Sequence, residues 1–95
     1  MKKAAALRYE RGKNKAPQLI ASGQGLLAEK IIELGAEYGV PLYEQKELVD
    51  ELLALPVGVE IPPELFQLVA QVFAFVLRLD EEKGRGKGGN GYGQR

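Results

Sequence analysis

The sequence contains no cysteine, histidine, threonine or tryptophan, and Ser22 is its only serine. The missing cysteine excludes disulfide bonds and thiol catalysis, and without histidine the usual zinc sites are excluded as well. Ser22 has no histidine to act as its general base, so a Ser-His-Asp mechanism is also excluded. We therefore expect a protein that is not an enzyme and that holds no metal and no cofactor.

Long apolar runs are missing too. The run Ala4 to Ala6 is far too short for the apolar part of a secretory signal. The most apolar stretch, 65–79, is interrupted by Gln67, Gln71 and Arg78, and at this length it falls short of the roughly 20 residues that cross a membrane. We expect a cytoplasmic protein with no direct membrane insertion, and the missing cysteine fits a reducing compartment.

The 95 residues, 45% of them hydrophobic, suffice for one modest core. The formal net charge of zero conceals a partition: residues 1–15 carry +5, residues 16–82 carry −9 and residues 83–95 carry +4. An acidic body repels phosphate, so we expect no nucleic-acid partner. The last twelve residues include six glycines and no aliphatic side chain, and such a segment cannot offset its ordering entropy. The sequence predicts one folded domain over 1–80 and a disordered, basic, Gly-rich tail over 81–95.

The pattern of elements predicts an α/β domain. Ala4 to Tyr9 and Pro17 to Ala21 indicate two antiparallel strands joined by a polar turn with Gly12 and Asn14. A helix should follow Gly25, pack through Leu27, Ile31, Leu34 and Tyr38, and end at Gly39. Val40 to Tyr43 is expected to be a third strand, parallel to 17–21 through a right-handed crossover.

Two more helices complete the expected order β-β-α-β-α-α around a small mixed sheet of about three strands. Residues 44–55 place Leu48, Val49, Leu52 and Leu53 on one side and acidic residues on the other. The pair Pro62-Pro63, followed by Glu64, predicts the start of the last helix. That helix has an apolar face wider than a small sheet can cover, so part of it packs on the other helices or faces a partner.

One motif favours a different function. Gly23-Gln-Gly25-Leu-Leu-Ala28 matches the dinucleotide fingerprint G-x-G-x-x-[GA], and Glu44 follows at a suitable interval. In that case the helix amides would hold a pyrophosphate and Glu44 would hold ribose hydroxyls. The alternative is a tight strand-to-helix turn that Ser22 helps to cap, and the chain is too short for the second half of a dinucleotide fold.

Five ordered strings carry a resemblance to a known family: Ala4-Ala-Ala-Leu-Arg-Tyr9, Ala16-Pro-Gln-Leu-Ile-Ala-Ser-Gly-Gln-Gly25, Ala28-Glu-Lys-Ile-Ile32, Tyr38-Gly-Val-Pro-Leu42 and Gly58-Val-Glu-Ile-Pro-Pro-Glu-Leu65. Together they resemble the cytoplasmic C-terminal domain of the FlhB family, the export-switch proteins of flagellar and type III secretion systems. The resemblance covers roughly residues 4–79. It implies the same α/β fold.

The sequence departs from that family at one functional point. Members carry a self-cleaving Asn-Pro-Thr-His loop just before the strand that aligns with 4–9, whereas this position holds Met1-Lys2-Lys3. Neither Asn14 nor Asn90 precedes a proline, so self-cleavage by this route is not expected. The chain is similar to a free-standing version of the fragment that follows the cut. In the family a strand before the loop pairs with the sheet, and without it a sheet edge near 4–9 would be open.

The resemblance implies a non-enzymatic interaction module for flagellar or type III protein export. It would stand in for, or accompany, the post-cleavage fragment of the export-switch protein. We expect contacts with that membrane protein, other apparatus components or export substrates, and recruitment to the inner face of the membrane; a homodimer through the open edge is an alternative. The expected partner-binding residues are Leu7, Arg8, Tyr9, Phe75 and Leu79. The alternative function is a small nucleotide-binding module that uses Gly23 to Ala28.

Overall fold

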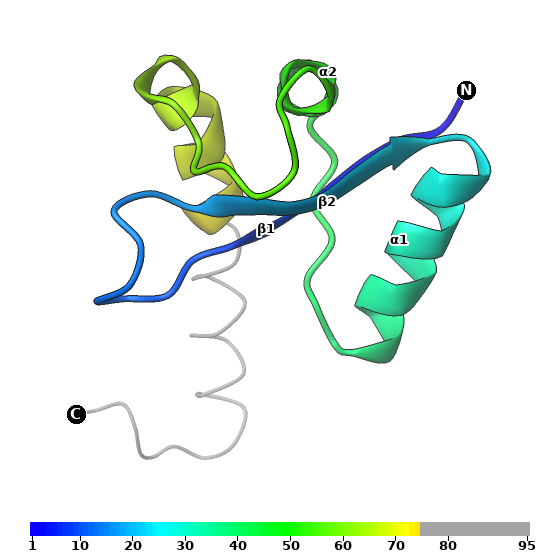
Figure 1. Cartoon of the computed structure of the whole chain (residues 1–95). Coiled ribbons are helices and arrows are strands. Elements are labelled where there is room, and N and C mark those ends of the chain that lie inside the picture. Colours follow the sequence, from blue (N-terminus) through cyan, green and yellow to red (C-terminus); the bar gives the residue numbers. More distant parts are fainter. Residues whose placement is uncertain (75–95) are drawn as a thin grey trace.

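A computed structural model describes residues 1–74 of the chain. Its elements are β1 (Lys3–Arg8), β2 (Gln18–Gln24), α1 (Leu26–Glu37), α2 (Lys46–Leu53) and a short 3-10 turn (Pro63–Leu65). The turn continues into a helix over 66–74, which we call the 66–74 helix. Figure 1 shows α2 and α1 on opposite sides of the β1–β2 hairpin. The predicted α/β class with helices around a small sheet is confirmed.

The hairpin is antiparallel and irregular near its middle. Lys3 lies opposite Gln24 and Ala6 opposite Ala21, but Leu7 pairs with Leu19 because the register shifts between Ala6 and Leu7. One extra residue in one strand is a β-bulge, which bends the strand and increases its twist. Strand β2 runs on to Gln24, so Ser22 belongs to the strand and does not cap α1, whose N-cap is Gly25.

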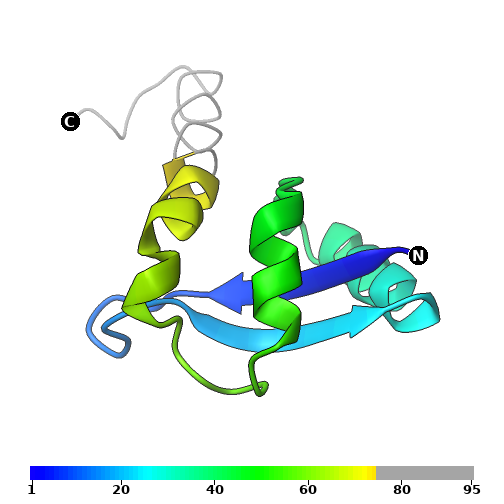
Figure 2. The same ribbon diagram turned by 90° about the horizontal axis from the view of Figure 1, so that it is seen from above.

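The third strand that we expected over Val40 to Tyr43 is wrong. Within residues 1–74 the sheet has two strands only, and residues 40–45 form no regular structure. In both views this segment passes the β1 side of the hairpin and runs across the strand direction, from α1 on one face to α2 on the other (Figures 1 and 2). A segment that crosses a strand cannot form a ladder with it, and Pro41 lacks one of the donors that a ladder needs.

The main core lies between the hairpin and α2, where the fully buried Leu19 is central. The loop before the 3-10 turn closes this side, because Leu19 N donates to the Val59 carbonyl at 2.9 Å and Ile61 N donates to the Pro17 carbonyl at 2.8 Å. Figure 2 shows α2 and the 66–74 helix crossing the hairpin on this face. The buried cluster consists of Leu19, Leu48, Leu52, Ile61, Leu65 and Val69. The predicted inward face of α2 and the predicted helix start at Pro62-Pro63 are therefore confirmed.

Helix α1 packs on the other face through small residues. The buried residue of the helix is Ala28, and the buried small residue of the hairpin is Ala4. The packing face of this helix differs from the predicted one, since Leu27 is 54% exposed and Tyr38 is 80% exposed. Small side chains on both sides bring helix and hairpin close together, and the larger side chains then lie at the margin of the contact.

Candidate functional site

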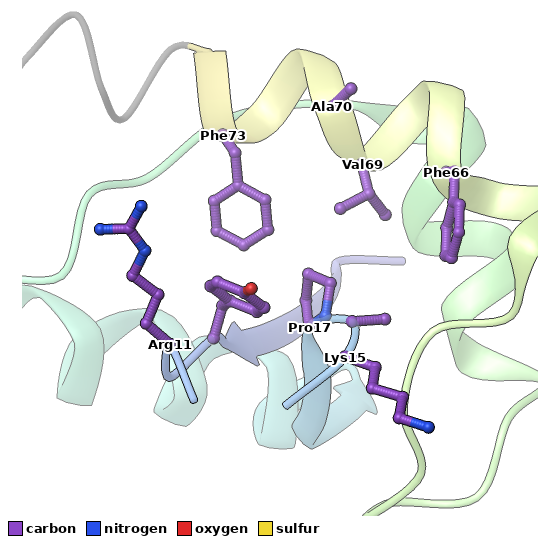
Figure 3. Close-up of a pocket in the computed structure, with 9 residues that line it drawn as sticks. Arg11, Lys15, Pro17, Phe66, Val69, Ala70 and Phe73 are labelled. Atoms are coloured by element: carbon purple, nitrogen blue, oxygen red, sulfur yellow. The ribbon is translucent and has the colours of Figure 1, made fainter. Parts of the chain in front are cut away.

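An apolar pocket of about 690 Å³ opens between the hairpin turn and the 66–74 helix. Its lining joins two parts of the chain that are about fifty residues apart in the sequence, as Figure 3 shows. The turn side contributes Tyr9, Arg11, Lys15, Ala16 and Pro17, and the helix side contributes Phe66, Val69, Ala70 and Phe73. Apart from the two cations and the tyrosine hydroxyl, these side chains are hydrocarbon.

The helix wall follows from helical periodicity. Phe66, Val69 and Phe73 are separated by three and four residues, so they share one face of the helix. The two phenylalanines are two turns apart, or about 10 Å along the axis. Val69 is buried at the base, whereas Phe66 is 46% exposed at the rim. The wall is therefore a groove about two helical turns long.

The turn side of the pocket is held in place by polar contacts. Asn14 Oδ1 accepts a hydrogen bond from Glu10 N at 3.0 Å, and Asn14 Nδ2 donates to Glu60 Oε2 at 3.3 Å. Gly12 supplies the left-handed conformation that the turn requires, with φ of 84°. These contacts fix the turn against the loop that precedes the 66–74 helix and so fix the width of the pocket.

Two aromatic rings border one end of the pocket. The ring centroids of Tyr9 and Phe73 are 6.5 Å apart and the planes are tilted by 56°, a geometry that aromatic pairs favour. Because Tyr9 comes directly after β1 and Phe73 from the helix, the pair joins the two walls. Tyr9 is thus a pocket residue and not a strand residue.

Two cations flank the apolar lining. In Figure 3 Arg11 lies toward the Phe73 end, and Lys15 lies below Pro17 toward Phe66. Within residues 1–74 neither side chain forms an ion pair. The carboxylate of Glu10 instead lies 3.8 Å from Lys13, and Glu60 is held by Asn14. The pocket therefore combines a hydrocarbon interior with positive charge at its borders.

The second feature is an open strand edge. Strand β1 pairs with β2 along one edge. In the described part of the chain, the backbone hydrogen bonds outside the helices and the ladder involve none of residues 3–8. The outer edge of β2, in contrast, is partly covered by the bridge between Gln18 and Glu60. The outer edge of β1 is the one available for an additional strand.

The structure separates the residues that we predicted as one partner-binding set. Leu7 is half-buried and packs on the main core, and Arg8 is exposed and donates to Gln18 Oε1 at 3.4 Å. Tyr9 belongs to the pocket, while Phe75 and Leu79 lie outside the described residues. Sequence reasoning missed the pocket itself. Its only signal was the width of the apolar face on the last helix.

The two glycines of the motif have packing roles in the turn between β2 and α1. Gly25 N donates to the Lys2 carbonyl at 2.7 Å, so this amide at the start of α1 is already used. A Cβ at Gly23 would lie 2.4 Å from Leu27 Cγ, so glycine there makes room for Leu27. Glu44 does not follow a strand. The geometry favours the alternative that the motif is a tight strand-to-helix turn.

No group of three or more acidic, histidine or cysteine side chains within residues 1–74 could hold a metal ion. None of the helices in this part of the chain combines the length and the hydropathy needed to cross a membrane.

Comparison with known proteins gives matches over nearly the whole described fold. The family described as FlhB HrpN YscU SpaS matches residues 1–76. The uncharacterized protein YlqH of Bacillus subtilis is 42% identical over 81 residues, which are 85% of this chain and 87% of that protein. The flagellar biosynthetic protein FlhB of Aquifex aeolicus is 40% identical over 75 residues, which are 78% of this chain and 21% of that protein. The chain thus spans about a fifth of the FlhB relative.

Solved structures agree with the sequence matches. The crystal structure of the PscU C-terminal domain is 28% identical with a TM-score of 0.73, and the match covers 78% of this chain and 95% of that one. A mutated EscU/SpaS C-terminal domain is 28% identical with a TM-score of 0.75, over 80% of this chain and 95% of that one. The chain belongs to the FlhB HrpN YscU SpaS family and has the fold of that family's C-terminal domain.

Proposed function

We propose that this protein is a non-enzymatic interaction module of the flagellar or type III export apparatus. It stands in for, or accompanies, the post-cleavage cytoplasmic fragment of the export-switch protein, and it works at the cytoplasmic face of the membrane. The observation that carries the proposal is the open outer edge of β1 in a domain of this family. An extended segment that adds to such an edge gains backbone hydrogen bonds.

Several features of β1 support a specific partner over accidental pairing. Lys2, Lys3 and Arg8 place positive charge at both ends of the strand, which discourages aggregation through the edge. Leu7 already packs on the main core, so an incoming strand would dock on a fixed template. The segment 40–45 passes the same side of the hairpin but forms no strand, so the β1 edge has no ladder partner on that side within residues 1–74.

The experiment is a titration of the chain with the export-switch cytoplasmic segment truncated at its cleavage asparagine, which retains the upstream strand. We expect specific one-to-one binding that Leu7→Pro abolishes. Because Leu7 touches the core, amide exchange provides a second readout: Leu7 and Tyr9 should exchange rapidly in the isolated protein and become protected in the complex. Strong protection in the isolated monomer would contradict the proposal, and concentration-dependent sedimentation would instead indicate a homodimer through this edge.

The pocket supports a second contact, with export substrates. Its hydrocarbon lining and its volume of about 690 Å³ fit one or two apolar side chains of a peptide. A site of this kind selects a short segment with an aromatic or branched aliphatic anchor. Tyr9 directly follows β1, whereas the other residues that line the pocket are further from that strand in the sequence. Mutations at those other residues can therefore test the pocket without changing the outer edge of β1.

The pocket is tested by filling it. Ala70 is exposed on the pocket wall, and Ala70→Trp should block peptide binding without disturbing the buried Val69. Gln67 is exposed on the same helix outside the pocket lining, so Gln67→Trp is the matched control. Fluorescence anisotropy with a labelled peptide that carries a Leu-Phe pair measures both. Equal binding by the two variants would argue against the pocket as the site.

A further inference from the structure

The cations at the pocket border point to a more specific ligand, and this inference rests on the proposed role of the pocket in binding export substrates. We infer that the pocket selects peptide segments in which an apolar anchor is flanked by carboxylates. Arg11 and Lys15 would form ion pairs with these carboxylates. Apart from the Tyr9 hydroxyl, the interior of the pocket is hydrocarbon and discriminates between side chains by size and hydrophobicity. Preference for particular residues beside the anchor of a bound peptide can therefore arise only from Arg11 and Lys15 at the border of the pocket.

Arg11 and Lys15 have no carboxylate partner within the described fold. Lys3, Lys13, Lys30 and Lys46 each lie within 4.0 Å of a carboxylate, whereas Arg11 and Lys15 form no ion pair with any residue of 1–74. Arg11 and Lys15 are also the cations that line the pocket. Lys2 and Arg8 also form no ion pair within residues 1–74, but Arg8 donates to Gln18 and neither side chain lines the pocket. A peptide bound in the pocket would therefore meet two cations, Arg11 and Lys15, that no carboxylate of the described fold neutralises.

The positions of Arg11 and Lys15 suit a peptide with a charge on each side of its anchor. The two cations come from the same turn but border different parts of the pocket, Arg11 toward Phe73 and Lys15 toward Phe66 (Figure 3). These phenylalanines are about 10 Å apart along the helix axis. A peptide that places an apolar anchor between them therefore carries its neighbouring side chains toward one cation on each side. This arrangement favours a carboxylate before and after the anchor.

Charge is unevenly distributed over the described fold. Residues 8–15 hold four basic side chains and one acidic one, a net charge of +3, whereas residues 16–74 hold two basic and nine acidic ones, a net charge of −7. Residues 1–7 add Lys2 and Lys3 with no acidic side chain, a net charge of +2, at the opposite end of the hairpin from the turn. An acidic peptide near the pocket is thus attracted to the turn and repelled by the acidic surface of residues 16–74. Such complementarity favours association at one place and reduces binding elsewhere.

The experiment compares three labelled peptides of about ten residues, each with a central Leu-Phe pair. One has a glutamate on each side of the pair, one has glutamines there and one has lysines. We expect the glutamate peptide to bind about threefold to tenfold more tightly than the glutamine peptide at low salt, since exposed ion pairs are individually weak. The advantage should shrink in 0.5 M NaCl because salt screens exposed charges.

Variants connect the effect to the two cations. Arg11→Gln with Lys15→Gln should remove the preference for glutamate and leave the binding of the glutamine peptide unchanged. Lys13→Gln removes one charge from the same turn, but Lys13 does not line the pocket, so the preference should remain. The single variants Arg11→Gln and Lys15→Gln should each lose about half of the preference on a logarithmic scale.

The possible outcomes separate this inference from the proposed function. If all three peptides bind equally and Ala70→Trp blocks them, the pocket is a docking site and the charge inference is overturned. If the glutamate preference persists in Ala70→Trp, the charges act without the pocket and the inference is overturned as well. If no peptide binds, both the inference and the proposed role of the pocket fail. A glutamate preference that needs Ala70, Arg11 and Lys15 supports both.

Discussion

Lys3 Nζ lies 2.8 Å from Asp50 Oδ1 and links the edge strand β1 to α2. Lys46 approaches the other oxygen of the same carboxylate at 3.6 Å. The hydrogen bond from Lys3 holds the pKa of Asp50 below its ordinary value, and the charges of Lys3 and Lys46 act in the same direction against desolvation. The pair is exposed to solvent, so it fixes the position of α2 over β1 more than it stabilises the fold.

This pair predicts a pH dependence of stability. A lowered folded-state pKa contributes stability above the unfolded-state pKa of 3.8, and the contribution is lost as the pH falls through the folded pKa. Lys3→Gln should therefore be less stable than the wild type at neutral pH, and the difference should close as the solution is acidified below about pH 4. Urea unfolding at several pH values measures this difference. Lys46→Gln is the control and should show a smaller gap; a gap for Lys3→Gln that does not depend on pH would contradict the assignment.

A second prediction concerns the core. Leu19 is fully buried, whereas its neighbour Ile20 is 41% exposed at the register shift. Leu19→Ala should lower the free energy of unfolding by about 2–5 kcal/mol. Ile20→Ala should cost less than about 1 kcal/mol, because it removes little buried area. Chemical denaturation measures both values. Similar losses in the two variants would mean that β2 presents its side chains differently in solution.

A third prediction tests the role of the glycine motif. A Cβ at Gly23 would lie 2.4 Å from Leu27 Cγ and 3.0 Å from Leu27 Cβ. Gly23→Ala should therefore displace Leu27 and lower the free energy of unfolding by about 1–3 kcal/mol. In the background Leu27→Ala the same change should cost much less, since the clash is gone. A double-mutant cycle measures the coupling, and independent effects of the two changes would show that Gly23 is needed for another reason.

The local parts of this fold were predictable from the sequence because their causes are local. Gly39 follows α1 with φ of 72°, and its amide and that of Val40 donate to Ala36 and Gly35 in the expected helix-ending pattern. Pro62-Pro63 likewise sets the start of the last helix. In each case the constraint lies within a few residues of the element that it determines.

The wrong predictions depended on non-local contacts. Val40 to Tyr43 has the composition of a strand, but it runs across the hairpin strands and therefore pairs with neither of them. The largest apolar residues of α1 predicted one packing face. The helix instead packs on the hairpin through the small Ala28, and Ala4 is the buried small residue of β1. The pocket joins Tyr9 to Phe73, and no periodicity in either segment shows that they meet.

Gly35 inside α1 and Gly39 just after its end should respond in opposite ways to substitution by alanine. Gly39 has φ of 72° and no neighbour within 4 Å of an added Cβ, so Gly39→Ala is strained by the backbone alone. It should lower the free energy of unfolding by about 1–2 kcal/mol. Gly35 lies inside the helix, and its added Cβ would meet Val40 at an ordinary 3.8 Å. Gly35→Ala should therefore raise the free energy of unfolding by about 0.5–1 kcal/mol, because alanine loses less backbone entropy than glycine in a helix. Thermal unfolding of both variants provides the test. A loss of stability in Gly35→Ala would mean that the added Cβ does not fit beside Val40 and that α1 lies closer to the segment that follows it.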